Sequence, residues 1–100
     1  MQTPISRLEK KVRKENLWVY ILTLLEKKEL YAFEIRDMIN QRFGFWIGNV
    51  TAYKVLYLLE QGKYVSSSLR HNKRYYKITT EGRAQLRLAK KFFRDFLKGQ

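Results

Sequence analysis

Four cationic side chains surround one short turn in the stretch SSSLRHNKRYYKIT, residues 66–79, namely Arg70, Lys73, Arg74 and Lys77. Guanidinium and ammonium groups at a hairpin tip suit contacts with phosphate oxygens, and an arginine can also enter a narrow minor groove of DNA. The alternative is a solvated hairpin tip without a ligand. What precedes and follows this stretch in the chain must decide between the two.

The charge of the whole chain favours a polyanionic partner. Lys and Arg outnumber Asp and Glu by 21 to 9 over 100 residues, which gives a formal net charge of +12. Such a field attracts nucleic acid first and an anionic membrane surface second, while a basic surface kept only for solubility is the third explanation. The length corresponds to one domain with a modest core.

Several kinds of chemistry are excluded by the residue types. The chain has no cysteine and a single histidine, His71, so we expect no disulfide, no thiolate or histidine metal site and no catalytic triad. Paired carboxylates and a glycine-rich phosphate loop are also missing. We therefore expect neither an enzyme nor a cofactor. The charged opening is no signal peptide and no apolar run is long enough to span a membrane, so we expect a cytoplasmic protein.

The first part of the chain has the periodicity of amphipathic helices. Thr3 and Pro4 resemble an N-cap followed by proline at the first helical position, and Asn16 is a candidate cap for a second helix with a core-facing leucine stripe. Whether residues 4–26 form one helix or two stays open. After a polar EKKE turn, Ala32, Ile35, Ile39 and Phe43 predict another helix that ends at Gly44.

The next predicted helix covers residues 49–61. Asn49 is a good N-cap for a helix that continues to Gln61, with its apolar face at Ala52, Val55, Leu56 and Leu59. The opposite face then carries Val50, Lys54, Tyr57 and Gln61.

From Lys63 the apolar period becomes two, which predicts an edge hairpin with Tyr75 outward and Tyr76 inward. The tip lacks Asn-Gly, so we expect a loop longer than two residues, with Asn72 at positive φ. Thr79 caps a final helix, whose Leu86, Ala89, Phe93 and Phe96 have the spacing of a short coiled coil.

This order of elements is the layout of a winged helix-turn-helix, a mainly α fold with a small β-hairpin and flanking N- and C-terminal helices. We divide the chain into a basic helical arm at 1–15, a winged DNA-binding domain at 16–79 and a dimerisation helix at 80–100. Its recognition helix would be 49–61 and its wing 66–78. The residues that we expect to contact DNA are Asn49, Thr51, Tyr53, Lys54, Tyr57, Arg70, His71, Asn72, Lys73, Arg74 and Lys77.

Three stretches in this order, LWVYILTLLEKKELYAFEI, TAYKVLYLLEQGKYV and NKRYYKITTEG, resemble the PadR family of transcriptional regulators. The resemblance covers residues 17 to about 86. Gly62 lies one position before the family's turn glycine. The resemblance implies Thr51 and Tyr53 as DNA contacts and the last helix as a dimerisation element. It also implies that a small aromatic effector binds near the dimer helices, with Trp18, Phe92 and Phe93 as candidates.

We therefore expect a homodimeric transcriptional repressor that binds double-stranded DNA in a sequence-specific manner. Its dimer interface would use apolar residues of both arms, namely Leu8, Val12, Leu86, Ala89, Phe93, Phe96 and Leu97. The main alternative is a winged-helix protein that binds RNA or a nucleoprotein without reading sequence. A third is a protein-interaction module whose basic face serves only solubility.

Overall fold

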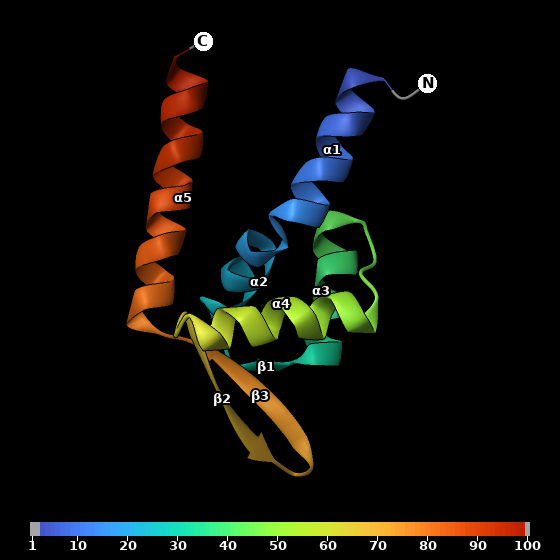
Figure 1. Cartoon of the computed structure of the whole chain (residues 1–100), viewed down its shortest axis with the longest axis vertical. Coiled ribbons are helices and arrows are strands. Elements are labelled where there is room, and N and C mark those ends of the chain that lie inside the picture. Colours follow the sequence, from blue (N-terminus) through green and yellow to red (C-terminus); the bar gives the residue numbers. More distant parts are fainter. Residues whose placement is uncertain (1–2, 100) are drawn as a thin grey trace.

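The computed structural model describes residues 3–99, and Figure 1 shows their arrangement. Their elements are α1 (Pro4–Glu15), α2 (Leu17–Leu25), β1 (Leu30–Tyr31), α3 (Ala32–Phe43), α4 (Asn49–Gln61), β2 (Val65–Arg70), β3 (Lys73–Ile78) and α5 (Thr80–Lys98). The predicted divisions 1–15 and 80–100 include residues 1, 2 and 100, which lie outside the described residues. None of the helices between residues 3 and 99 combines the length and apolar character needed to cross a membrane.

The open question at residues 4–26 is answered by two helices. Asn16, with φ −118° and ψ 31°, leaves helical geometry between α1 and α2, and its side chain makes no capping hydrogen bond. At the start of α1, the Thr3 hydroxyl accepts a hydrogen bond from the Ser6 N–H at 3.2 Å, which confirms the predicted cap. No residue of α1 is buried, so α1 extends from the domain as an arm.

The hydrophobic core is built around α2. This helix buries Leu17, Ile21, Leu22, Leu24 and Leu25, and it packs against α3, α4, α5 and β3. Burial on nearly all sides explains why its sequence is apolar almost throughout. The other helices complete the core with one buried stripe each, as their periodicity predicts: Ala32, Ile35 and Ile39 from α3, Ala52, Leu56 and Leu59 from α4, and Leu86 from α5.

The sheet has three antiparallel strands in the order β1-β3-β2. In its register Leu30 pairs with Tyr76, and Val65 pairs with Ile78. Strand β1 is absent from the sequence-based prediction because two residues are too few to display a period of two. The hairpin is therefore not an isolated ribbon: β2 is an edge strand as predicted, whereas β3 is central.

The hairpin turn is shorter than predicted. Only His71 and Asn72 lie between β2 and β3, with φ values of 50° and 63°. Two consecutive left-handed residues match the type I′ turn, whose twist fits that of the flanking strands. Asn and His tolerate this conformation better than most residues other than glycine, so the Asn-Gly pair is not required. The positive φ predicted for Asn72 is confirmed.

Helix α3 ends where predicted, but α4 starts differently. Gly44 adopts φ 79° and its N–H donates to the Asn40 carbonyl at 2.9 Å, the expected left-handed termination. The N-cap of α4 is Gly48, not Asn49, so the predicted cap is wrong. Asn49 is the first helical residue, and its side-chain oxygen is engaged by Arg36 on α3 instead.

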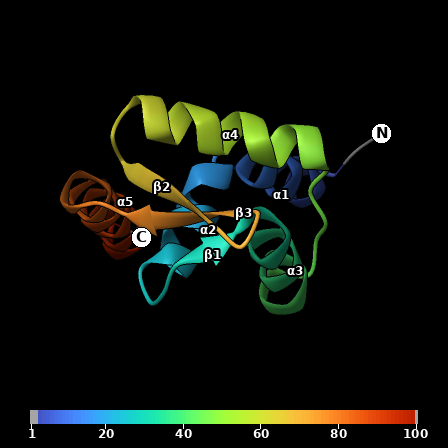
Figure 2. The ribbon, with the colours of Figure 1, turned by 90° about the horizontal axis from the view of Figure 1, so that it is seen from below.

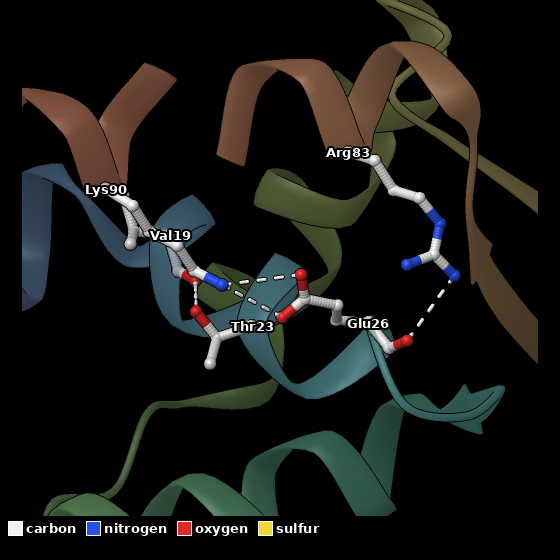
Figure 3. A network of polar contacts seen from close by, with 5 residues as sticks. All are labelled: Val19, Thr23, Glu26, Arg83 and Lys90. Atoms are coloured by element: carbon white, nitrogen blue, oxygen red, sulfur yellow. Dashed lines mark hydrogen bonds and ion pairs between the residues drawn. The ribbon is translucent and has the colours of Figure 1, made fainter. Parts of the chain in front are cut away.

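Helix α5 is anchored at its first half and free at its second. The Thr79 hydroxyl accepts from the Gly82 N–H at 3.0 Å, as predicted for a cap, and donates to the Lys63 carbonyl at 2.7 Å. Figure 3 shows a polar link from α5 to α2, in which Lys90 Nζ lies 3.2 Å from Glu26 Oε1. In the same view, Arg83 donates to the Glu26 carbonyl at 3.4 Å. Beyond these contacts, α5 extends on the side of the molecule opposite the hairpin tip (Figure 1).

Candidate nucleic-acid interface

One face of α4 is available to a partner along its whole length. Its buried stripe faces α2 and α3, which leaves an outward row formed by Val50, Lys54, Tyr57 and Gln61. Viewed from the hairpin side, α4 lies along one edge of the domain with β2 beside it (Figure 2). A helix with one exposed face, next to a projecting hairpin, is the arrangement that places a recognition helix in a DNA major groove.

All five predicted contacts on α4 are exposed, but they point in different directions. Lys54 and Tyr57 belong to the outward row. Tyr53 lies on the side of the hairpin, where it adds to the effects of burial and of Glu60 that raise the pKa of the Tyr76 phenol. Thr51 lies on the other side, where it lines a hollow of about 480 Å³ shared with Lys10 and Lys14 of α1.

The segment before α4 is held by a single arginine on α3. Arg36 donates through Nε to the Ile47 carbonyl at 2.9 Å and through Nη1 to Asn49 Oδ1 at 2.8 Å. Its guanidinium also lies 5.9 Å from the ring centre of Trp46. These contacts join α3, the first helix of the expected helix-turn-helix, to the first turn of α4. They are a source of rigidity where DNA contacts are expected.

Two of the hairpin cations stack on tyrosines. Arg70 lies 4.2 Å from the Tyr75 ring centre and pairs with Glu29 at 2.8 Å, and Lys73 lies 4.5 Å from the Tyr31 ring centre. Tyr31 and Tyr75 in turn pack edge to face. Tyr75 is therefore half-buried by β1 and these side chains, whereas Tyr76 is buried in the core as predicted.

A polar chain connects the hairpin to the last turn of α4. The Ser67 hydroxyl donates to Glu60 Oε2 at 2.7 Å and accepts from Arg74 Nη1 at 3.1 Å. Beneath this chain, burial raises the pKa of the Tyr76 phenol, and the neighbouring Glu60 carboxylate adds to the effect. Glu60 thus links the hairpin to α4 through Ser67. The remaining predicted residues, His71, Asn72 and Lys77, are exposed near the tip.

Comparison with known proteins identifies this arrangement. The family model described as the transcriptional regulator PadR-like family matches residues 21–88. The chain belongs to the PadR-like family of transcriptional regulators. Its fold is the winged helix-turn-helix with β2 and β3 as the wing, and its family consists of DNA-binding regulators rather than enzymes.

Solved structures agree with the family assignment. A transcriptional regulator from Clostridium thermocellum is 25% identical, with a TM-score of 0.81 over 88% of this chain and 89% of that one. A PadR family transcription regulator from Clostridium difficile R20291 is 26% identical, with a TM-score of 0.77 over 82% of this chain and 91% of that one.

A winged-helix DNA-binding protein, F93 from STIV, shares the fold at 17% identity, with a TM-score of 0.70 over 80% of this chain and 88% of that one. No curated protein sequence matches the chain.

The left-handed turn after α4 falls on a lysine in this PadR-like regulator. Gly62 ends α4 at φ −80°, and the left-handed conformation falls on Lys63, with φ 65°. Lys63 thus turns the chain from α4 into the wing, whose first strand begins two residues later at Val65.

A pocket of about 350 Å³ lies between α1, α2, α4 and the start of α5. Trp18 lines it together with Leu22, Val55, Leu58 and Tyr64. Phe92 and Phe93, which the sequence suggested beside Trp18, do not line this pocket but lie exposed on α5.

The two arms of the PadR-like regulator carry most of the expected dimer residues. Leu8, Phe93, Phe96 and Leu97 are exposed by 58%, 46%, 62% and 68%, and Val12 and Ala89 are half-buried. The prediction for Leu86 is wrong. Leu86 was expected in the dimer interface, but its side chain is 1% exposed because the first half of α5 packs on the domain's own core. Its side chain is therefore not available to a second chain.

Three residues at the start of α4 or beside it were not among the predicted DNA contacts, although Val50 was predicted on the outward face. Val50 is the most exposed large apolar side chain of the described residues, at 83%, and Trp46 is exposed at 57%. Arg36 was missed because its partners lie 11 and 13 positions away, beyond the reach of helical periodicity. A bulky, apolar FWI segment directly before a helix start was the available signal for Trp46.

Proposed function

We propose that this PadR-like protein is a homodimeric, sequence-specific repressor. Helix α4 would lie in the major groove of double-stranded DNA, and the wing would contact the flanking backbone or minor groove. The observation that carries the proposal is the joint presentation of the α4 outward row and the basic wing, which Glu60, Ser67 and Arg74 hold together.

The residues divide into two roles. Lys54 and Tyr57, on the outward row of α4, are placed to meet base edges, with Asn49, Thr51 and Tyr53 at its first turns. The wing cations would contact phosphates, which fix register without reading sequence. Lys73 and Lys77 suit this role as exposed cations, and His71 and Asn72 lie at the tip that approaches the duplex.

The dimer would form through the arms. The exposed residues of α5 include five large apolar side chains within ten positions, namely Leu88, Phe92, Phe93, Phe96 and Leu97. Ile5 and Leu8 on α1 are exposed on the same end of the molecule, opposite the wing (Figure 1). A second copy would cover both faces and place two α4 helices on half-sites about one helical turn of DNA apart.

The division into a basic arm at 1–15, a winged domain at 16–79 and a dimerisation helix at 80–100 follows from this proposal. Repression would be steric, since a dimer across an operator excludes other proteins from the same DNA. Because the target is DNA, we place the protein in the cytoplasm.

Selection from a random duplex pool tests the proposal most directly. We expect enrichment of a palindromic motif, and a log–log salt slope of about −0.9 for each phosphate contact. Lys73→Ala with Arg74→Ala should weaken binding to all sequences alike and make the slope shallower by about 1 to 2. Arg94→Ala with Lys98→Ala removes the same charge from exposed positions on α5, which extends opposite the hairpin tip (Figure 1), and should change affinity much less.

The same experiment separates the competing functions. Binding that follows salt but enriches no motif would favour a nucleic-acid protein without sequence specificity. A wing variant that binds as the wild type does, with a flat salt response, would leave a protein-interaction module as the better description.

The pocket at Trp18 supports a second role, the binding of a small aromatic effector. Its volume falls in the range of ligand pockets, and Val55, Leu58 and Leu59 of α4 form one of its walls. A ligand there would touch the helix that reads DNA. In a Trp46→Phe background, Trp18 is the only tryptophan, so its fluorescence should change on titration with a naphthalene sulfonate dye. Leu58→Glu should abolish the change, and an unchanged signal would argue against the pocket.

A further inference from the structure

We propose that Arg36 sets the hydrogen-bonding polarity of Asn49, so that the first residue of α4 offers only N–H donors to DNA. This inference rests on the proposed function, because it assumes that the start of α4 faces the duplex. It deepens that function by stating which chemical groups this position can recognise, namely acceptor atoms.

The orientation of the Asn49 amide follows from the chemistry of its partner. A guanidinium has donors and no acceptor, so only the amide oxygen can face Arg36. The Nη1 to Oδ1 distance is 2.8 Å, and Arg36 is itself held by its Nε bond to the Ile47 carbonyl at 2.9 Å. Two bonds to different residues fix the plane of the guanidinium. The Nδ2 group of Asn49 must then point away from α3.

This geometry excludes the most common role of asparagine in a major groove. Bidentate recognition of adenine needs the amide oxygen and nitrogen to face the same base edge, the oxygen accepting from N6 and the nitrogen donating to N7. Arg36 occupies one lone pair of Oδ1 and holds this oxygen toward α3, so Nδ2 is the group directed to the DNA. The adjacent guanidinium also disfavours a donor such as the adenine amino group, because both carry positive partial charge.

The group that Asn49 recognises is therefore an acceptor. Guanine offers two acceptors, N7 and O6, on its major-groove edge, and a phosphate offers oxygens at every position. Both sources satisfy the same donor. They differ in whether the contact carries sequence information, and that difference can be measured.

The experiment compares three variants of the full chain on the selected operator and on duplexes changed at one base pair at a time. Asn49→Asp keeps an acceptor for Arg36 and removes the donor, and we expect binding to weaken about tenfold. Arg36→Met frees the amide to turn. Arg42→Met is the control, since Arg42 is an exposed arginine near the end of the same helix. Circular dichroism melts check that each variant is folded.

The two acceptor sources give different results. For a guanine, the Asn49→Asp loss is confined to one base pair, and Arg36→Met relaxes that position so that adenine is accepted. For a phosphate, the loss is the same on every duplex, and Arg36→Met weakens binding uniformly. Either pattern supports the proposal.

Three outcomes would overturn it. The first is wild-type affinity and base preference in Arg36→Met, and the second is a wild-type preference for adenine at the position that Asn49→Asp alters. If either of these two results is found while the wing variant still loses affinity, this inference fails and the proposed function stands. The third is that neither the wild type nor the wing variant binds DNA selectively, in which case both fail. In the free protein, Arg36 Nε–H should exchange with solvent more slowly than that of Arg42, a readout that needs no DNA.

Discussion

At the scale of single residues, the wing shows how cationic side chains can be ordered by weak contacts. Arg70 and Lys73 lie over tyrosine rings, contacts worth about 0.5–1 kcal/mol at exposed sites. The Arg70–Glu29 ion pair is exposed on both sides and contributes at most about 1 kcal/mol. Contacts this weak restrain the side chains, yet they can be exchanged for a phosphate at small cost.

Tyr76 gives a prediction for alkaline pH. Its pKa is raised in the folded protein above the ordinary value of 10.0, by burial first and then by the Glu60 carboxylate. The unfolded chain therefore loses the phenolic proton at lower pH than the native state. The stabilisation is fully present below pH 10.0 and is lost as pH rises through the folded pKa.

Urea unfolding between pH 8 and 11 measures this effect. Tyr76→Phe should remove part of the alkaline decline in the free energy of unfolding, and Tyr57→Phe controls for the loss of a tyrosine at an exposed site. An alkaline decline in Tyr76→Phe as steep as that of the wild type would contradict the assignment.

At the scale of elements, the position of α5 depends on one close approach. A Cβ atom at Gly82 would collide with the Tyr64 carbonyl oxygen and would lie 2.8 Å from Ile78 Cγ1. Only glycine lets the first turn of α5 lie this close to the chain entering β2. The same turn receives the Thr79 cap, so the wing and α5 share one junction.

Gly82→Ala should therefore destabilise the protein by about 3 kcal/mol, at the upper end of overpacking costs, because a backbone oxygen cannot move as a flexible side chain can. Thr80→Ala, an exposed change in the same turn, should stay within about 0.5 kcal/mol of the wild type. Thermal melts of both variants provide the measurement. Equal melting temperatures for the two would show that the junction is looser than described.

At the scale of the whole molecule, the two arms and the wing lie at opposite ends (Figure 1), and each arm carries exposed apolar side chains. A net charge of +12 opposes self-association in general, so a stable dimer requires a localised apolar contact. The exposed apolar side chains of α5, together with Ile5 and Leu8 of α1, form such a surface.

Phe96→Glu should convert the expected dimer to a monomer in light-scattering measurements at micromolar concentration. Operator affinity should then fall by about 100-fold or more, because the second half-site no longer adds to binding. Phe33→Glu is the matched control, since Phe33 is a comparably exposed phenylalanine on α3, at 56% against 62%. A wild type that is monomeric with or without DNA would refute the dimer.

The sequence by itself determined the features that depend on local interactions. The caps at Thr3 and Thr79, the helix end at Gly44 and the split between Tyr75 and Tyr76 were all predictable, because a cap acts across one turn and a strand alternates its faces. The outward row of α4 follows in the same way from a period of 3.6 residues.

Only the tertiary structure decided the features that join distant parts of the chain. Strand β1 exists because Leu30 and Tyr31 meet β3, and Leu86 is buried because α5 packs on α2. Asn49 looked like a cap from its neighbours, yet Arg36 on another helix holds its side chain. Periodicity predicts which face of an element is apolar but not which residues of other elements contact it. The polarity of the proposed DNA contact depends on such a contact, the one between Arg36 and Asn49.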